Sequence, residues 1–216
     1  SQTNTTANIT AKTLNITGIT ANTKVYDGNT SATINTSGVT NATLVSGGMV
    51  AGDNITVTST GTFRNADNSA TDKNVGTGKA VTTAYTLSGT DAANYSLVQA
   101  SGLTADITAK ALTASYTGTN RVYNALTGAT VAGSSSDIIS GDTVTFSQSA
   151  AFADKNVGTA KTVNVTGISL GGTDAGNYAL QSSTASTTAN ITQASLSVSG
   201  ATAANRVYDG TTSASV

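Results

Sequence analysis

The sequence predicts an all-β protein built from tandem antiparallel β-sandwich modules of the immunoglobulin-like kind. Thr, Ser, Asn, Gly and Ala dominate the composition, and these residues suit half-buried strands and tight turns. Apolar and polar residues alternate with a period of two in several segments. Every acidic residue is Asp, whereas Glu, a common residue of helix surfaces, does not occur. The alternative is a β-grasp-like module, which would need a packed helix.

Four short motifs recur in the same order along the chain, so the chain is a tandem repeat. A Tyr motif starts at Lys24, Arg121 and Arg206, and a Lys motif (Asp-Lys-Asn-Val-Gly-Thr) starts at residues 72 and 154. An Asn-Tyr motif (Gly-Thr-Asp-Ala-x-Asn-Tyr) starts at residues 89 and 172, and a joint motif starts at residues 7, 105 and 189. The spacing predicts the tail of a preceding repeat at 1–8, repeats at 9–106 and 107–190, and a partial third repeat at 191–216.

These motifs resemble the YDG repeat of filamentous-haemagglutinin-like bacterial surface adhesins. The resemblance implies a secreted or surface-tethered protein, exported by a two-partner system, that carries many such modules in a row. Repeat two departs from the pattern because Asn124 and Ala125 stand where the other copies have Asp and Gly. A chemical site made of Asp27 and Gly28 would therefore be missing from repeat two, and the motif is interpreted as structural.

About six strands are expected in each repeat, in the same order. The strand that opens each repeat carries its apolar residues on one face, and the strand before the Lys motif alternates apolar residues with Thr or Ser. The apolar positions are Leu14, Ile16, Ile55, Val57 and Phe63 in repeat one and Leu112, Ala114, Tyr116, Val144, Phe146, Ala150 and Phe152 in repeat two. The strand after the Lys motif alternates from Val81 to Leu87 without a break. In repeat two the alternation changes parity between Val165 and Ile168, which predicts a β-bulge at Gly167.

The Tyr motif is predicted to pack its tyrosine ring, with the hydroxyl bonded to a backbone group and Asp-Gly forming a turn. This expectation applies to Tyr26, Tyr123 and Tyr208. In the Lys motif, neighbours on a strand point to opposite faces, so Asp72, Lys73 and Asn74 are not expected to converge. A solvated lysine is therefore predicted, and a Lys–Asn isopeptide bond is the alternative.

The only helical candidates are single turns at 91–94 and 174–177, which Asp91 and Asp174 would cap. Calcium is the alternative role for these two residues, but it needs a dense cluster of oxygen ligands and the sequence has no such run. No catalytic, cofactor-binding or metal-binding residue is predicted, and the binding residues stay unknown. Asn-x-Ser/Thr sequons are frequent, and they fall at Asn4, Asn8, Asn15, Asn29, Asn35, Asn41, Asn54, Asn94, Asn164 and Asn190.

Several function classes are excluded by composition. The chain has no His and no Cys, so it can form neither a conventional Ser-His-Asp triad nor a disulfide. Lys and Arg number 10 against 11 acids and form no basic stripe, which argues against nucleic-acid binding. No apolar run reaches the length that spans a membrane, and no signal peptide opens the sequence. The chain is therefore not expected to be an enzyme.

The function predicted is that of extracellular spacer repeats, which project the binding region of an adhesin from a bacterial surface or within a biofilm. The alternative is a module that binds a host glycan or protein through the two long loops of repeat one, residues 39–51 and 64–71. Ice binding is a third idea, but it needs a flat, regular array of Thr side chains from short repeats, and these repeats are long. The expected partners are neighbouring repeats. Residues 191–216 are expected to form a hairpin (195–201 with 206–216) that packs on repeat two or adds to the sheet of another copy.

Overall fold

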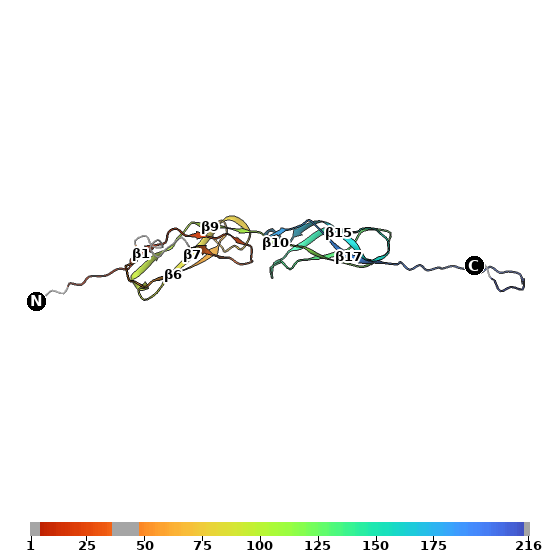
Figure 1. Ribbon diagram of the computed structural model, residues 1–216, viewed down its shortest axis with the longest axis horizontal. Helices are drawn as coiled ribbons and strands as arrows, with labels where there is room; N and C mark the ends of the chain where they lie inside the picture. The colour runs from red at the N-terminus through yellow and green to blue at the C-terminus, as the bar shows by residue number, and fades with distance from the viewer. Residues whose placement is uncertain (1–4, 36–47, 214–216) are drawn as a thin grey trace. The chain divides into compact units, whose positions relative to one another are not determined.

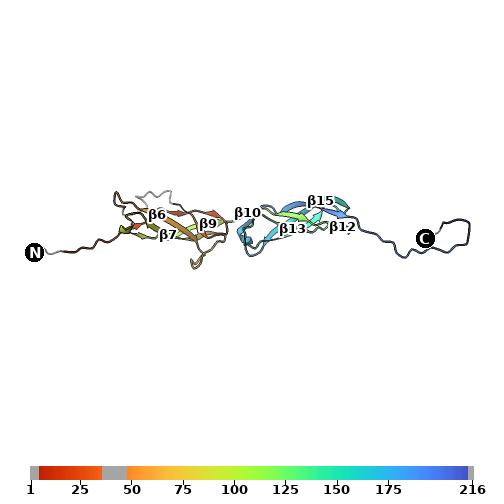
Figure 2. The ribbon, with the colours of Figure 1, turned by 90° about the horizontal axis from the view of Figure 1, so that it is seen from below.

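The computed structural model describes residues 5–35 and 48–213 and confirms an all-β protein (Figures 1 and 2). In this part of the chain the helical elements are two single 3-10 turns, η1 (Ala92–Asn94) and η2 (Ala175–Asn177). They lie where the sequence predicts short turns. No helix among the described residues is long and apolar enough to cross a membrane.

The chain folds into two compact units. The first comprises Ser1–Ala114, Ser135–Ser147 and Ser169–Ser183, and the second comprises Ser115–Ser134, Gln148–Ile168 and Thr184–Val216. The first unit therefore contains repeat one together with three pieces of repeat two: the segment around Asp142, the Asn-Tyr motif and the first strand. The repeat boundary at residues 106 and 107 stays a prediction.

Repeat one is built on a five-stranded sheet in the order β3 (Lys24–Val25), β9 (Leu103–Thr108), β7 (Gly76–Ser88), β6 (Thr56–Phe63) and β4 (Ser31–Ala32). The long central strands β6 and β7 are antiparallel, with Phe63 opposite Val81. Two small sheets complete the repeat: β1 (Lys12–Asn15) pairs with β8 (Tyr95–Val98), and β2 (Thr20–Ala21) pairs with β5 (Ile34–Asn35).

Repeat two has the corresponding sheets. Its four-stranded sheet runs in the order β12 (Arg121–Val122), β17 (Thr184–Thr192), β15 (Gly158–Gly171) and β14 (Thr145–Phe152). The small sheets are β10 (Lys110–Leu112) with β16 (Tyr178–Leu180), and β11 (Ser115–Gly118) with β13 (Val131–Ser134). The same motifs thus form the same strand pairs twice.

The expectation of purely antiparallel sheets is wrong. The strand that opens each repeat pairs in parallel with the strand after the Asn-Tyr motif, as β1 with β8 and β10 with β16. The Tyr-motif strand likewise pairs in parallel with the last strand of its repeat, as β3 with β9 and β12 with β17. Parallel partners need a long connection, and the rest of the repeat provides it here. The immunoglobulin-like arrangement of the sheets stays a prediction.

The predicted alternation of strand faces is confirmed. Ile55 and Phe63 are buried while Thr56, Thr58 and Thr60 are exposed. In β15, Val163, Val165 and Ile168 are all buried, although the last two are three residues apart. Gly167 between them adopts φ +64°. The alternation of buried and exposed residues is therefore shifted by one residue at Gly167, where the sequence predicts a bulge.

The Asp-Gly step of the Tyr motif forms a turn, as predicted, and Asn124-Ala125 of repeat two forms the same turn. A side-chain oxygen of Asp27, Asn124 or Asp209 accepts the backbone N–H two residues later, at 3.0–3.1 Å. The residue in between has positive φ each time: +78° at Gly28, +67° at Ala125 and +73° at Gly210. The Asp-to-Asn change of repeat two keeps this turn because an amide oxygen accepts the same bond.

Two alanines of repeat two occupy left-handed positions where repeat one has glycine. Ala125 (φ +67°) corresponds to Gly28, and Ala160 (φ +47°) corresponds to Gly78. A left-handed alanine costs roughly 1–2 kcal/mol, partly offset by the smaller entropy of the unfolded chain. We expect Ala125→Gly and Ala160→Gly each to raise the free energy of unfolding by about 1 kcal/mol in urea titrations. Ala153→Gly, without the positive φ, serves as the control and should not be stabilising.

The partial third repeat does not form the predicted hairpin. Residues 193–213 contain no strand, and Leu196, Val198 and Tyr208 are almost fully exposed, Tyr208 by 91%. The prediction that this segment packs on repeat two is therefore wrong. The pairing of this segment with another copy stays a prediction. In repeats one and two the Tyr-motif strand is held by the last strand of the same repeat, and residues 191–216 include no counterpart of that strand.

Candidate functional site: a tyrosine–aspartate cluster in the first unit

The centre of a polar cluster in the first unit is the carboxylate of Asp142, whose side chain is 2% exposed. The segment before β14 supplies it, directly after Gly141. The hydroxyls of Tyr26 and Tyr178 both donate to its Oδ2 atom, at 2.8 and 2.7 Å. The two rings meet edge to face with centroids 5.6 Å apart. Tyr26 itself is only 1% exposed.

Lys73 supplies the cation of this cluster. Its Nζ donates to Asp142 Oδ1 at 2.8 Å and lies 3.7 Å from Asp174 Oδ1. The same ammonium lies 5.7 Å from the centroid of the Tyr26 ring. The other oxygen of Asp142 is already engaged by tyrosine hydroxyls, so both carboxylate oxygens are hydrogen-bonded. A buried charge satisfied in this way does not carry the penalty of an unpaired one.

Asn177 fixes the neighbouring Lys motif and is 4% exposed. Its Oδ1 accepts the backbone N–H of Val75 at 2.9 Å, and its Nδ2 donates to Asn74 Oδ1 at 3.0 Å. On the other side, the N–H of Ile139 donates to the Tyr178 hydroxyl at 2.9 Å. The cluster therefore joins the Tyr and Lys motifs of repeat one to the Asp142 segment and the Asn-Tyr motif of repeat two.

The family model described as YDG domain matches residues 10–102 and, a second time, residues 108–187. The two matches together cover most of the chain. The chain belongs to the YDG domain family. No curated protein and no solved structure matches it. The cluster around Asp142 is thus formed by motifs of two consecutive YDG domains.

The pKa values in the cluster reflect competition between burial and hydrogen bonding. Burial pushes the pKa of Asp142 upward, but bonds from Lys73, Tyr178 and Tyr26 outweigh it, so the pKa is lowered. The bond to Asp142 raises the pKa of Lys73. Burial, and then the adjacent Asp142 carboxylate, raise the pKa of Tyr178 to about 12. The favoured state is a charged Lys–Asp pair beside neutral tyrosines.

These shifts predict alkaline lability. A group with a raised folded-state pKa contributes stability that is present below its unfolded pKa and lost as pH rises through the folded value. For Tyr178 the loss should run from about pH 10, the ordinary tyrosine value, to about pH 12, and Lys73 acts in the same direction. We expect melting temperatures to fall steeply over this interval. Tyr178→Phe should start lower and fall less, whereas Tyr208→Phe, in the exposed tail, should follow the unmodified chain.

Several predicted roles of the motif residues need correction. The Tyr26 hydroxyl bonds a carboxylate rather than a backbone group, whereas the half-buried ring of Tyr123 packs against a core cluster as predicted. Lys73 is an ion-pair partner of Asp142, which was not predicted, although its side chain is still 36% exposed; Lys155 is exposed as predicted. Asp72 and Lys73 do point to different partners, as predicted, because Asp72 pairs with Lys79. These partners are determined by tertiary contacts. The absence of a covalent cross-link stays a prediction, which an intact-mass measurement would test.

Asp91 and Asp174 do not cap their 3-10 turns with their side chains. Their Oδ2 atoms instead accept the backbone N–H groups of Asn54 and Thr143, at 2.8 and 2.9 Å. Each aspartate therefore ties its Asn-Tyr motif to the residues just before β6 or β14. Among the described residues no group of three or more acidic side chains could hold a metal ion.

Sequence reasoning missed Asp142 as a site residue. The available signal was the Gly-Asp pair that precedes the Thr-rich strand in both repeats, at residues 52–53 and 141–142. A buried aspartate after a glycine looks like an ordinary turn in sequence, and nothing local indicates which tyrosines or lysine will reach it.

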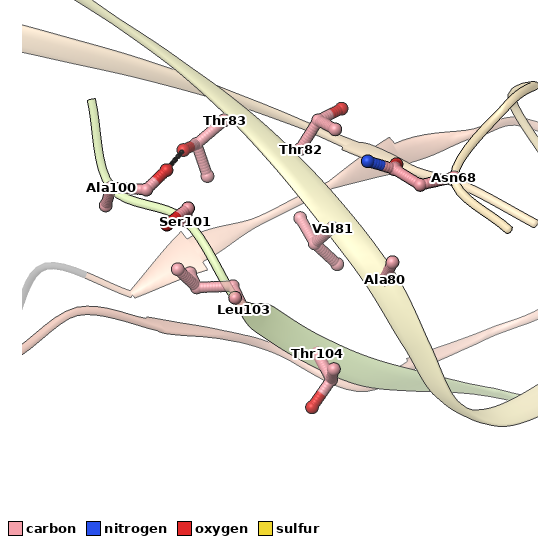
Figure 3. A pocket seen from close by; sticks show the side chains of 10 residues that line it. Asn68, Ala80, Val81, Thr82, Thr83, Ala100, Ser101, Leu103 and Thr104 are labelled. Atoms are coloured by element: carbon pink, nitrogen blue, oxygen red, sulfur yellow. Dashed lines mark hydrogen bonds between the residues drawn. The ribbon is translucent and has the colours of Figure 1, made fainter. Parts of the chain in front are cut away.

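The long loop at residues 64–71 lies beside a hollow of about 270 Å³ between β7 and the start of β9 (Figure 3). Val81 and Leu103 line the hollow, and the Thr83 hydroxyl bonds the Ala100 carbonyl at 3.0 Å. No charged side chain lines it, and ligand sites are usually about 300–1,000 Å³. The loop closes on itself, since Arg64 bonds Asn68 within it. Most of the other long loop, residues 39–51, lies outside the described residues.

Proposed function

We propose that these YDG domains are extracellular spacer repeats of a filamentous-haemagglutinin-like bacterial surface adhesin. The observation that carries the proposal is that the motif residues of repeat one are hydrogen-bonded within the protein. In repeat one, Tyr26 and Lys73 bond Asp142, and Asn74 bonds Asn177, so these motif residues are used in linking motifs of consecutive domains. A ligand or substrate would find these groups already engaged.

The exposed strand faces support the same role. Thr56, Thr58 and Thr60 of β6 face solvent, and the hydroxyls of Thr58 and Thr86 bond across the strands at 2.6 Å. Such faces stay hydrated and offer no apolar patch for adventitious contacts. The sequence also lacks Cys, which suits a chain that crosses an oxidising space before it folds.

Catalysis is not proposed because the polar cluster lacks an accessible reacting group. Asp142 is enclosed, and Lys73 keeps its proton because its pKa is raised. A general base or nucleophile needs a pKa near the working pH and contact with substrate. An immunoglobulin-like arrangement of the sheets in each repeat belongs to the proposal as well, since such sandwiches are a common design of surface modules.

Two experiments test the spacer role. In the first, the chain is displayed on a bacterial surface between an anchor and a terminal epitope tag. The height of the tag should rise by equal steps as further copies of residues 9–190 are added. In the second, the full chain is applied to glycan and extracellular-matrix protein arrays, and a spacer should show no saturable binding. Unequal or absent height steps would contradict the proposal.

A binding role through the long loops is the second candidate. Its specific support is that Asn68 borders the hollow beside β7. Saturable array binding that disappears when residues 64–71 are replaced by the short connection of repeat two would favour this function over the spacer. The internal bonding of the loop is the reason we rank it second.

A further inference from the structure

Asp53 in repeat one stands in the same local geometry as Asp142 in repeat two. The Tyr95 hydroxyl donates to Asp53 Oδ2 at 2.5 Å and accepts the N–H of Val50 at 2.9 Å. These bonds correspond to those that Tyr178 makes with Asp142 and Ile139. We call Asp53, Asp91, Asn94 and Tyr95 the acceptor face of repeat one. Its counterpart in repeat two is Asp142, Asp174, Asn177 and Tyr178.

The acceptor face of repeat one is uncovered among the described residues. No lysine or second tyrosine pairs with Asp53 in the described ranges, whereas Asp142 binds Lys73 and Tyr26. Asn94 is exposed, although the matching Asn177 is buried. Val50 is 55% exposed, whereas the matching Ile139 is half-buried.

Repeat two carries the complementary residues in an equally uncovered state. We call Tyr123, Lys155, Asn156 and Val157 its donor face, and its counterpart in repeat one is Tyr26, Lys73, Asn74 and Val75. Lys155 and Asn156 are exposed, and Val157 is exposed by 47%. The structure describes no hydrogen bond from the Lys155 ammonium or the Tyr123 hydroxyl within residues 5–35 and 48–213.

The tyrosine of the donor face packs against equivalent core residues in both repeats. Tyr123 packs against the core cluster that contains Phe152, Val163 and Ile191. Tyr26 packs in a cluster with their counterparts Phe63, Val81 and Ile107. Tyr123 is therefore positioned by its own repeat without any partner residue, which lowers the cost of docking.

We propose that the donor face of one copy binds the acceptor face of a second copy, head to tail. Lys155 would pair with Asp53 and Asp91, as Lys73 pairs with Asp142 and Asp174. The Tyr123 hydroxyl would donate to Asp53, and Asn156 would bond Asn94. The two faces differ, so the contact is heterologous and leaves one free face at each end of the assembly. This association holds whether or not the repeats act as spacers.

One substitution between the repeats tunes this contact. A Cβ added to Gly28 would lie 3.0 Å from Ile139 Cγ2, so the motif turn packs closely on that side chain. Beside the donor face, repeat two has Ala125 at this position, and beside the acceptor face repeat one has Val50, which is one methyl group smaller than isoleucine. We expect Ala125→Gly to tighten the association by relieving this contact.

Sedimentation velocity of the full chain from 1 µM to 1 mM tests the proposal. We expect an open series of oligomers that grows with concentration. Lys155→Glu and Asp53→Lys should each give monomers when alone. Mixed together, these two variants should restore the open series, since native Lys155–Asp53 contacts alternate with contacts in which both charges are reversed. A chain carrying both substitutions should associate again through the reversed ion pair.

Matched charge changes in the tail, Arg206→Glu and Asp209→Lys, serve as controls and should leave the series unchanged. If Asp53→Lys does not fold, Asn94→Arg blocks the same face from an exposed position and replaces it. A chain that stays monomeric up to 1 mM would overturn the proposal. So would association that the tail variants abolish and Lys155→Glu does not, because that result assigns self-association to residues 193–213.

Discussion

Replacing Asp142 by asparagine is expected to lower the free energy of unfolding by about 3 kcal/mol. The carboxylate is 2% exposed and accepts bonds from Tyr26, Tyr178 and Lys73. An amide in its place turns an NH₂ group toward these donors and leaves Lys73 without its closest counter-charge. Urea unfolding followed by tyrosine fluorescence measures the loss. Faster hydrogen exchange at the amides of Val75 and Ile139 should accompany it.

Asp53→Asn is the matched control for this prediction. It makes the same chemical change at the corresponding position of repeat one, where the side chain accepts only the Tyr95 hydroxyl among the described residues. We expect a loss of about 1 kcal/mol, the value of one ordinary hydrogen bond. Equal losses for the two variants would mean that Lys73 and Tyr26 add nothing to the stability of the cluster.

Gly172→Ala is expected to be about as damaging, at roughly 3–4 kcal/mol. Gly172 has φ +100°, and a Cβ there would lie 2.4 Å from the carbonyl oxygen of Thr143. That backbone oxygen accepts the N–H of Asp174, so it cannot move without breaking the turn. Displacing the turn also displaces Asn177 and Tyr178, which bond Val75 and Asp142.

Gly102→Ala separates backbone strain from steric overlap. Gly102 also has positive φ (+78°), but an added Cβ there meets no atom within 4 Å. Its cost should therefore be limited to the left-handed conformation, about 1–2 kcal/mol. If Gly172→Ala costs no more than Gly102→Ala in the same urea titration, the close approach to Thr143 is not a constraint.

Features that depend on neighbours in the chain could be predicted from the sequence. The turn at Asp27 and Gly28 needs only an acceptor side chain and a residue that tolerates positive φ. The change of face at Gly167 follows from the spacing of Val165 and Ile168. Both depend on contacts or periodicity within a few residues, which the sequence displays directly.

The wrong expectations concern partners that are distant in the chain. Alternation assigns a residue to a face of a strand, but it does not say which strand lies alongside, so the parallel pairs β3–β9 and β12–β17 were not expected. Lys73 could be placed in a motif, but its partner Asp142 is 69 residues away. The lysine of the same motif in repeat two, Lys155, is exposed, so the motif alone does not fix its environment.

By itself the sequence determined the repeat order, the all-β class, the turn in each Tyr motif and the faces of the long strands. Tertiary structure alone decided that Tyr26, Lys73, Asp142 and Tyr178 form one cluster while Tyr123 and Lys155 stay without these partners. The physical reason is that backbone turns and strand faces are set by steric and periodic rules within a segment. A buried ion pair, in contrast, forms only where folding removes water from both groups at once.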